Sequence, residues 1–103
     1  MDFQFKKEEK YLTAEVKIGI KYGIYPTSAA LIIRTIQKYN RDVFLEKEGN
    51  RVNAKSIMSL LALEAFEGSN VKILVEEGEG AEKLLERLKK GLETKTEGYP
   101  DFS

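Results

Sequence analysis

The sequence predicts an α+β fold of order βαββαβα, an open-faced β-sandwich with a four-stranded, mostly antiparallel sheet and three helices on one face. Three patterns predict it. Residues 11–20 alternate between apolar and polar side chains, as in a strand with one buried face. Residues 71–75 form an apolar run between turns, which indicates a buried strand. Three further segments repeat their apolar residues at helical spacing, and 103 residues fit one small domain.

The chain begins with a segment of mixed, charged residues. We treat residues 1–10 as an N-terminal lead-in, because they show no clear period. The strand at residues 11–20 follows directly. Its buried face carries four apolar residues: Ala14, Val16, Ile18 and Ile20.

A helix is predicted after the loop at residues 21–25. Pro26, Thr27 and Ser28 favour a helix start, since proline suits the first turn and hydroxyls suit capping. The apolar side of this helix carries Ala29, Ile32, Ile33 and Ile36. The spacing predicts an end near residues 39–40.

A hairpin and a second helix are predicted in the middle of the chain. Residues 42–47 form a strand, and a turn at residues 48–50 leads into a short return strand at residues 51–53. Ser56 then starts a helix that is expected to run to about Phe66.

The second helix is expected to have two apolar sides. At about 100° per residue, one side carries Leu60, Leu63 and Phe66. The other side carries Ile57, Met58, Leu61 and Ala65. One side has to face the sheet. The other is therefore either a contact surface for a partner or covered by a neighbouring loop or the C-terminal segment.

The last helix has one leucine-rich side. Its apolar residues are Ala81, Leu84, Leu85, Leu88 and Leu92. The opposite side is charged, with acidic residues early and basic residues late, as the helix dipole favours. Residues 93–103 have no period, so we expect a flexible C-terminal tail after a domain that spans residues 11–92.

The composition excludes several classes of function. Lysine plus arginine number 17, as do aspartate plus glutamate, so no net charge attracts nucleic acid or an anionic membrane. No apolar stretch could span a bilayer or act as a signal peptide, and a cytoplasmic location is the expectation. Cysteine and histidine are absent, which removes thiolate chemistry and the commonest general base and metal ligand. No cofactor or metal is expected, and the acidic stretch 76–80 is read as a turn in preference to a cation site.

Two segments resemble one known family. Residues 21–30 read Lys-Tyr-Gly-Ile-Tyr-Pro-Thr-Ser-Ala-Ala and are similar to the active-site loop of HPr, the phosphocarrier of the bacterial sugar phosphotransferase system. Residues 53–61 read Asn-Ala-Lys-Ser-Ile-Met-Ser-Leu-Leu and resemble the regulatory serine region of the same family. The resemblance implies an HPr-like fold over the whole domain.

The departures from the family pattern fall at the phosphoacceptor site. Tyr25 stands where the family has its histidine, Thr27 where it has arginine, and Ser28 where it has proline. Pro26 removes a backbone N–H, and Thr27 supplies no guanidinium for a phosphate. A tyrosine hydroxyl, with a pKa of about 10, is a poor replacement nucleophile at neutral pH. The degenerate site at Tyr25, Pro26 and Thr27 therefore predicts a protein that is not an enzyme and no longer carries phosphate on histidine.

Ser56 occupies the position of the family's regulatory serine. Two interpretations stay open: a helix cap only, or a phosphorylation site that is also a cap. The resemblance to histidine-less catabolite-repression HPr-like proteins favours regulation through Ser56. It also implies protein partners, such as an HPr kinase/phosphorylase or a transcriptional regulator, and no direct contact with nucleic acid or membrane. The expected partner-binding residues are Ile57, Met58, Leu61 and Tyr25. The alternative is a plain protein-interaction module.

Overall fold

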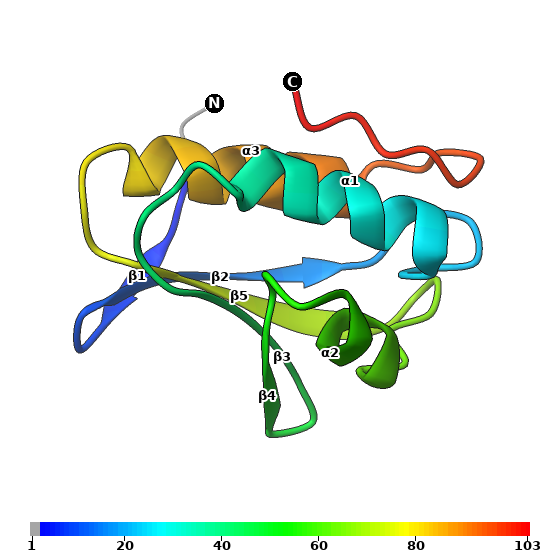
Figure 1. Ribbon diagram of the computed structural model, residues 1–103, viewed down its shortest axis with the longest axis horizontal. Coiled ribbons are helices and arrows are strands. Elements are labelled where there is room, and N and C mark those ends of the chain that lie inside the picture. Colours follow the sequence, from blue (N-terminus) through cyan, green and yellow to red (C-terminus); the bar gives the residue numbers. More distant parts are fainter. Residues whose placement is uncertain (1–2) are drawn as a thin grey trace.

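The sheet has five strands in the order β1-β2-β5-β3-β4, and each neighbouring pair is antiparallel. The computed structural model describes residues 3–103, which are shown in Figure 1. The elements are β1 (Lys6–Glu8), β2 (Tyr11–Lys17), α1 (Pro26–Ile36), β3 (Val43–Lys47), β4 (Asn50–Asn53), α2 (Ile57–Ala62), β5 (Asn70–Glu76) and α3 (Ala81–Glu93). The predicted open α+β fold is confirmed, but the prediction of four strands is wrong by one.

Strand β5 is the centre of the sheet. It pairs with β2 on one side and β3 on the other, so that Ile73 lies opposite both Ala14 and Leu45. All three side chains are buried. Leu74, on the opposite face of the strand, is buried as well, and burial on both faces explains the nearly continuous apolar sequence of β5.

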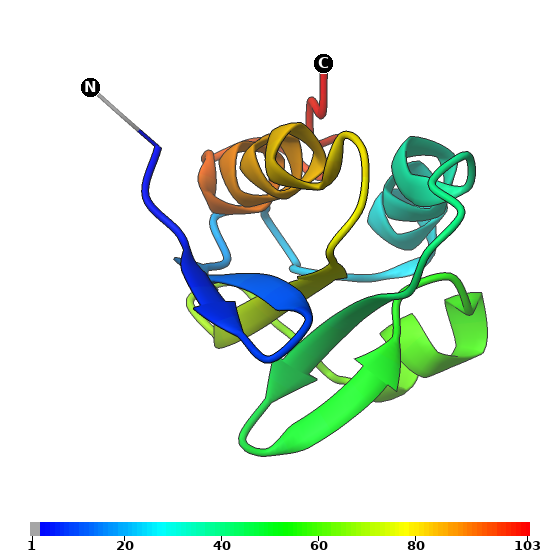
Figure 2. The same cartoon turned by 90° about the vertical axis from the view of Figure 1, so that its left-hand side faces the viewer.

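Helices α1 and α3 lie side by side over one face of the sheet (Figure 2). Helix α3 packs on β2 and β5, while α2 packs against α1 and β4 at the edge of the sheet. The two long helices bury the apolar sides that their sequences predict: Ala29, Ile32 and Ile36 from α1, and Ala81, Leu84, Leu85, Leu88 and Leu92 from α3.

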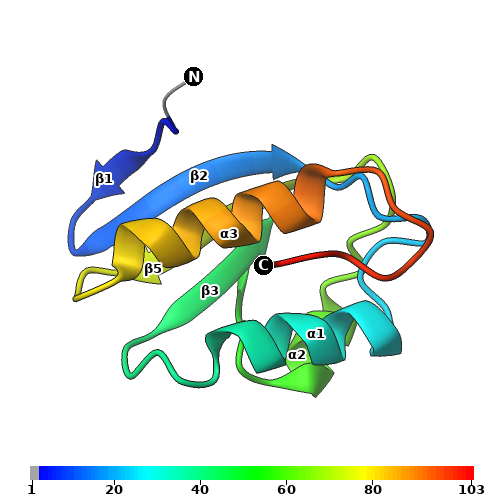
Figure 3. The ribbon, with the colours of Figure 1, turned by 90° about the horizontal axis from the view of Figure 1, so that it is seen from above.

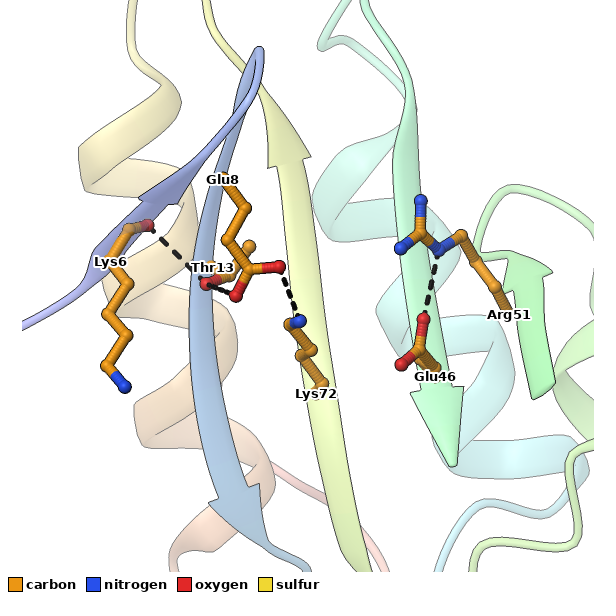
Figure 4. A network of polar contacts seen from close by, with 6 residues as sticks. All are labelled: Lys6, Glu8, Thr13, Glu46, Arg51 and Lys72. Atoms are coloured by element: carbon orange, nitrogen blue, oxygen red, sulfur yellow. Dashed lines mark hydrogen bonds and ion pairs between the residues drawn. The ribbon is translucent and has the colours of Figure 1, made fainter. Parts of the chain in front are cut away.

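The first strand lies inside the segment that we expected to be a lead-in. Lys6–Glu8 pairs with the start of β2, and the Glu8 carboxylate accepts hydrogen bonds from Lys72 at 2.6 Å and from the Thr13 hydroxyl at 3.3 Å. Figure 4 shows this network on the open face of the sheet, beside an Arg51–Glu46 ion pair. The Lys72 hydrogen bond lowers the pKa of Glu8. Residues 1–2 of the expected lead-in lie outside the described residues.

Helix α2 is shorter than its sequence predicts. It ends at Ala62 instead of near Phe66, and Glu64 adopts a left-handed φ of 54° that turns the chain. Beyond the turn the helical periodicity no longer applies. Ala65 is therefore buried and Phe66 exposed, the reverse of the predicted sides.

Residues 94–103 pack on the domain instead of forming the flexible tail that we expected. The main chain of Thr96 forms a parallel bridge with Ile20, and the Phe102 side chain is buried in the core. Seen from above, the segment turns near the start of α1 and runs back between α1 and α3 (Figure 3). The segment has no repeating apolar pattern, but burial of the aromatic Phe102 side chain is enough to hold it on the domain.

Candidate functional site

The loop before α1 has a constrained backbone. Tyr22 adopts a φ of 71°, which is uncommon for a residue with a side chain, and Gly23 follows with a φ of 73°. A side chain at Gly23 would collide with the backbone of Ala65 and Phe66. Only glycine therefore allows the loop to approach the chain beyond α2 this closely.

The loop ends where Tyr25 takes the N-cap position of α1 in an extended conformation. The buried Ser28 hydroxyl holds this turn together. Its oxygen accepts a hydrogen bond from the Tyr25 backbone N–H at 3.0 Å, and the hydroxyl lies 2.9 Å from the Gly23 carbonyl, to which it donates. The residue that departs from the family's proline thus acts as a structural clamp.

The Tyr25 side chain is half-buried between two segments. Its ring meets the Tyr22 ring edge-on, with 6.1 Å between the centroids. On another side, a Cβ built on Gly98 would lie only 2.5 Å from the Tyr25 hydroxyl oxygen. Nearby, the Lys21 ammonium donates a hydrogen bond to Glu97 at 3.4 Å, which raises the pKa of Lys21. The position that resembles a phosphoacceptor site therefore holds a phenol under the C-terminal segment.

Ser56 forms the N-cap of α2. Its side-chain oxygen accepts a hydrogen bond from the Ser59 backbone N–H at 3.2 Å. This is the geometry that both interpretations of Ser56 require, since a capping hydroxyl and a modified hydroxyl occupy the same place. Ser56 is half-buried, and its neighbour Lys55 reaches back to the Tyr39 carbonyl at 2.5 Å.

The outer side of α2 presents apolar side chains. Met58 is 75% exposed and Ile57 is 40% exposed, whereas Leu61 is half-buried against the core. Leu60 is fully buried, which shows the side of the helix that faces the domain. Phe66, four residues beyond the end of the helix, is also exposed, at 59%. We call Ile57, Met58 and Phe66 the α2 patch.

The sequence did not reveal two exposed aromatic residues in this region. The helical periodicity places Phe66 on the buried side of a longer helix, and the sequence places Tyr22 in the loop before α1 without indicating its exposure. The Lys47 ammonium lies 5.5 Å from the centre of the Phe66 ring, and the Lys21 ammonium lies 5.4 Å from that of Tyr22. The positive φ at Glu64, which exposes Phe66, has no signature in the sequence.

The structure brings the Tyr25 loop and the end of α2 together. The Ile24 backbone N–H donates a hydrogen bond to the Ala65 carbonyl at 2.7 Å. Tyr22 and Phe66 flank this junction in sequence, while Ser56 lies at the opposite end of the six-residue helix. The residues that the sequence predicts to bind a partner, Tyr25 and those of α2, therefore lie on neighbouring surfaces and do not line a common cavity.

The acidic stretch after β5 is engaged in ion pairs. Glu77 pairs with Lys7 at 2.8 Å, and Glu76 lies 3.7 Å from Lys10 and 3.8 Å from Arg41. Among residues 3–103 no group of three acidic, cysteine or histidine side chains is arranged to hold a metal. Within the same residues, no helix has the length and apolar character that a membrane crossing demands.

These features define a class of protein: a small phosphocarrier-like domain, in which an open-faced sandwich presents a loop at the start of α1 next to the short helix α2. The family model described as "PTS HPr component phosphorylation site" matches residues 12–94. The chain belongs to the HPr family.

Individual relatives agree with this assignment. The HPr-like protein Crh of Bacillus subtilis is 40% identical over 74 residues, which are 72% of this chain and 86% of that protein. The crystal structure of the phosphocarrier protein HPr from Bacillus anthracis superposes with a TM-score of 0.71 at 37% identity, covering 77% of this chain and 93% of that one. The solution structure of Bacillus subtilis Crh gives 0.61 at 34% identity, covering 82% and 99%.

Proposed function

We propose that this chain is a non-catalytic regulatory module of the HPr family, acting in the cytoplasm. It binds a protein partner through the α2 patch, and phosphorylation of Ser56 controls that binding. The observation that carries the proposal is the exposure of Ile57 and Met58 directly after the capping serine. A partner that covers this surface has to sense the charge on Ser56.

The loss of carrier chemistry supports a regulatory role. The chain contains no histidine, and the helix start that would bind a phosphoryl group begins with Pro26, which has no N–H. Thr27 provides no guanidinium to pair with phosphate. Tyr25 is half-buried under Gly98. Transfer of a phosphoryl group from one protein to another at this site therefore lacks both the acceptor and its electrostatic support.

The apolar character of the α2 patch supports protein recognition. Exposed apolar groups that lie together mark interfaces more often than isolated ones do. Met58 is flexible and polarizable, which suits contact with more than one partner. Phosphoserine at position 56 would add a charge of about −1.5 to −2 at the edge of this surface. An HPr kinase/phosphorylase and a transcriptional regulator are the two partners that this proposal names.

A second function rests on the Ser56 hydrogen bond itself. The hydroxyl already accepts the Ser59 N–H, so capping alone explains a serine at this position. On this view the chain is a plain protein-interaction module on the HPr fold. The α2 patch then binds its partner without a phosphorylation switch.

Incubation with ATP and the HPr kinase of the same organism distinguishes the two functions. We expect one phosphate, which peptide mapping places on Ser56. The modification should disappear in Ser56→Ala and persist in Ser59→Ala, the matched control in the same helix. Absence of phosphate on Ser56 with an active cognate kinase would reject the regulatory proposal and leave the plain interaction module.

A further inference from the structure

The C-terminal segment is attached to the domain at three places. We call residues 94–103 the C-terminal strap. At its start, the Lys21 backbone N–H donates to the Thr96 carbonyl at 2.9 Å beside the bridge to Ile20. In its middle, Gly98 lies against the Tyr25 hydroxyl. At its end, Phe102 is buried between α1 and α3.

The end of the strap is its strongest attachment. Phe102 is 6% exposed and packs so closely on Gly91 that a Cβ there would overlap the ring. The Arg87 Nε donates a hydrogen bond to the Phe102 carbonyl at 2.8 Å. A buried aromatic side chain contributes more apolar burial than any other residue type. Phe102 therefore holds the strap in place.

The middle of the strap fits its position only with glycine. Gly98 adopts a φ of 111°, which residues with side chains rarely adopt, and its missing side chain leaves room for the Tyr25 hydroxyl. The Gly98 residue itself is buried. The strap therefore packs directly on the hydroxyl end of the Tyr25 side chain.

The side-chain contacts at the start of the strap are weaker. The Lys21–Glu97 ion pair is exposed to solvent, and such pairs contribute little. Among the described residues, the Thr96 hydroxyl oxygen is buried without a hydrogen-bond partner, which opposes the closed position. The strap is therefore held mainly by Phe102 and by the fit at Gly98.

We infer that the C-terminal strap is an intramolecular cover, which occupies the surface around Tyr25 and excludes protein partners from it. The α2 patch lies outside the cover, because Met58 and Phe66 remain exposed. Residues 95–103 also lie beyond the part of the chain that the family model matches. The cover is thus built almost entirely from residues outside the matched part of the chain. It closes one of two neighbouring surfaces whether or not Ser56 is phosphorylated.

Iodination of tyrosine by lactoperoxidase and iodide tests the inference, because it modifies the ring carbons next to the hydroxyl, the part of Tyr25 that Gly98 faces. Tyr22, which is 63% exposed, serves as the reference inside the same molecule. With rates read by peptide mapping, we expect Tyr25 to react about tenfold more slowly than Tyr22 in the full chain, since its reaction requires local opening. The ratio should approach one in Phe102→Ala, which removes the anchor, and in Gly98→Val, which disrupts the fit.

Two controls keep this test decisive. Lys95→Ala changes an exposed strap residue and should leave the slow reaction of Tyr25 unchanged. Circular dichroism tests whether each variant is folded. If Phe102→Ala does not fold, the result for Gly98→Val decides the outcome. Equal rates for Tyr22 and Tyr25 in the full chain would overturn the inference. A Tyr25 that stays slow in a folded Gly98→Val variant would overturn it as well.

Discussion

The Ser28 hydroxyl oxygen lies 3.0 Å from the Tyr25 backbone nitrogen and accepts its hydrogen bond at the start of α1. The same hydroxyl donates to the Gly23 carbonyl, so a single buried side chain satisfies a donor and an acceptor of the loop. A buried backbone group without a partner is costly, which makes this serine a condition for the shape of the loop.

Ser28→Ala should therefore lower the free energy of unfolding by about 1–3 kcal/mol, because it leaves the buried Gly23 carbonyl and the partly buried Tyr25 N–H without their partner. Thr35→Ala is the control, since its hydroxyl bonds to the Leu31 carbonyl within the already complete helix. We expect that variant to lose less. Urea unfolding of both variants measures the difference, and equal losses would contradict the role of Ser28.

Ser56→Ala should destabilise the protein by about 0.5–2 kcal/mol, because the Ser59 N–H loses its capping acceptor. Ser56→Asp should be close to neutral, since aspartate is an equally good cap. Thermal unfolding compares the three proteins. A large loss in Ser56→Asp would show that the hydroxyl has a structural role besides capping.

Met58→Asp should reduce partner binding at little cost in stability, because exposed substitutions usually change it by no more than about 0.5 kcal/mol. Leu60→Asp should unfold the domain, since its side chain is fully buried and the charge would have no partner. Leu61→Asp should fall between them, as the side chain is half-buried. Melting temperatures measure this order, and three equal decreases would reject the assignment of the α2 patch.

Tyr25→His alone should not restore phosphotransfer from phosphoenolpyruvate and the general phosphotransferase enzyme. Pro26 still lacks an N–H and Thr27 still lacks a positive charge. Adding Thr27→Arg should give more transfer than Tyr25→His by itself. Mass spectrometry of the intact protein detects the acid-labile phosphate. Rapid modification of the single variant would show that the surrounding loop matters less than its geometry indicates.

Glu76 makes stability depend on acidity. A hydrogen bond from the Asp42 N–H at 3.0 Å, together with Lys10 and Arg41, holds the pKa of this carboxylate below its usual 4.5. A group with a lowered pKa stabilises the fold above its unfolded pKa and loses that effect as the pH falls through the folded value. Glu76→Gln should therefore destabilise most at about pH 6, with the difference shrinking towards about pH 3. Urea unfolding at both pH values measures it, and a constant difference would contradict this role.

The sequence predicted every element whose side chains alternate between core and solvent. The inner faces of β2 and β5 and the leucine-rich side of α3 were found where the periodicity placed them. Burial of a repeating apolar face determines these elements, so the repeat itself identifies them. The start of α1 at Pro26 could also be predicted, because proline is favoured in the first turn of a helix.

Three features lacked such a pattern. Strand β1 consists of charged residues and is held by pairing and by the Glu8 bridge, so no apolar period marks it. The end of α2 depends on the left-handed turn at Glu64. Glycine is the usual residue in this conformation, so a glutamate does not indicate a turn. The C-terminal strap is held mainly by the Phe102 side chain and by the fit at Gly98, and neither forms a period. The same reasons explain why Tyr22, Phe66 and Gly98 were missed at the candidate site.

The central position of β5 has a consequence for synthesis of the chain. The strands next to it, β2 and β3, come much earlier in the sequence and have no contact with each other in the sheet. Of the sheet, a nascent chain can therefore form only the β1–β2 and β3–β4 hairpins until residues 70–76 have emerged. Contacts between distant segments form slowly, and the apolar faces of both hairpins stay open to water meanwhile. Ribosomes stalled before Asn70 should thus display chains that chaperones bind, whereas chains released after α3 should fold in one cooperative step.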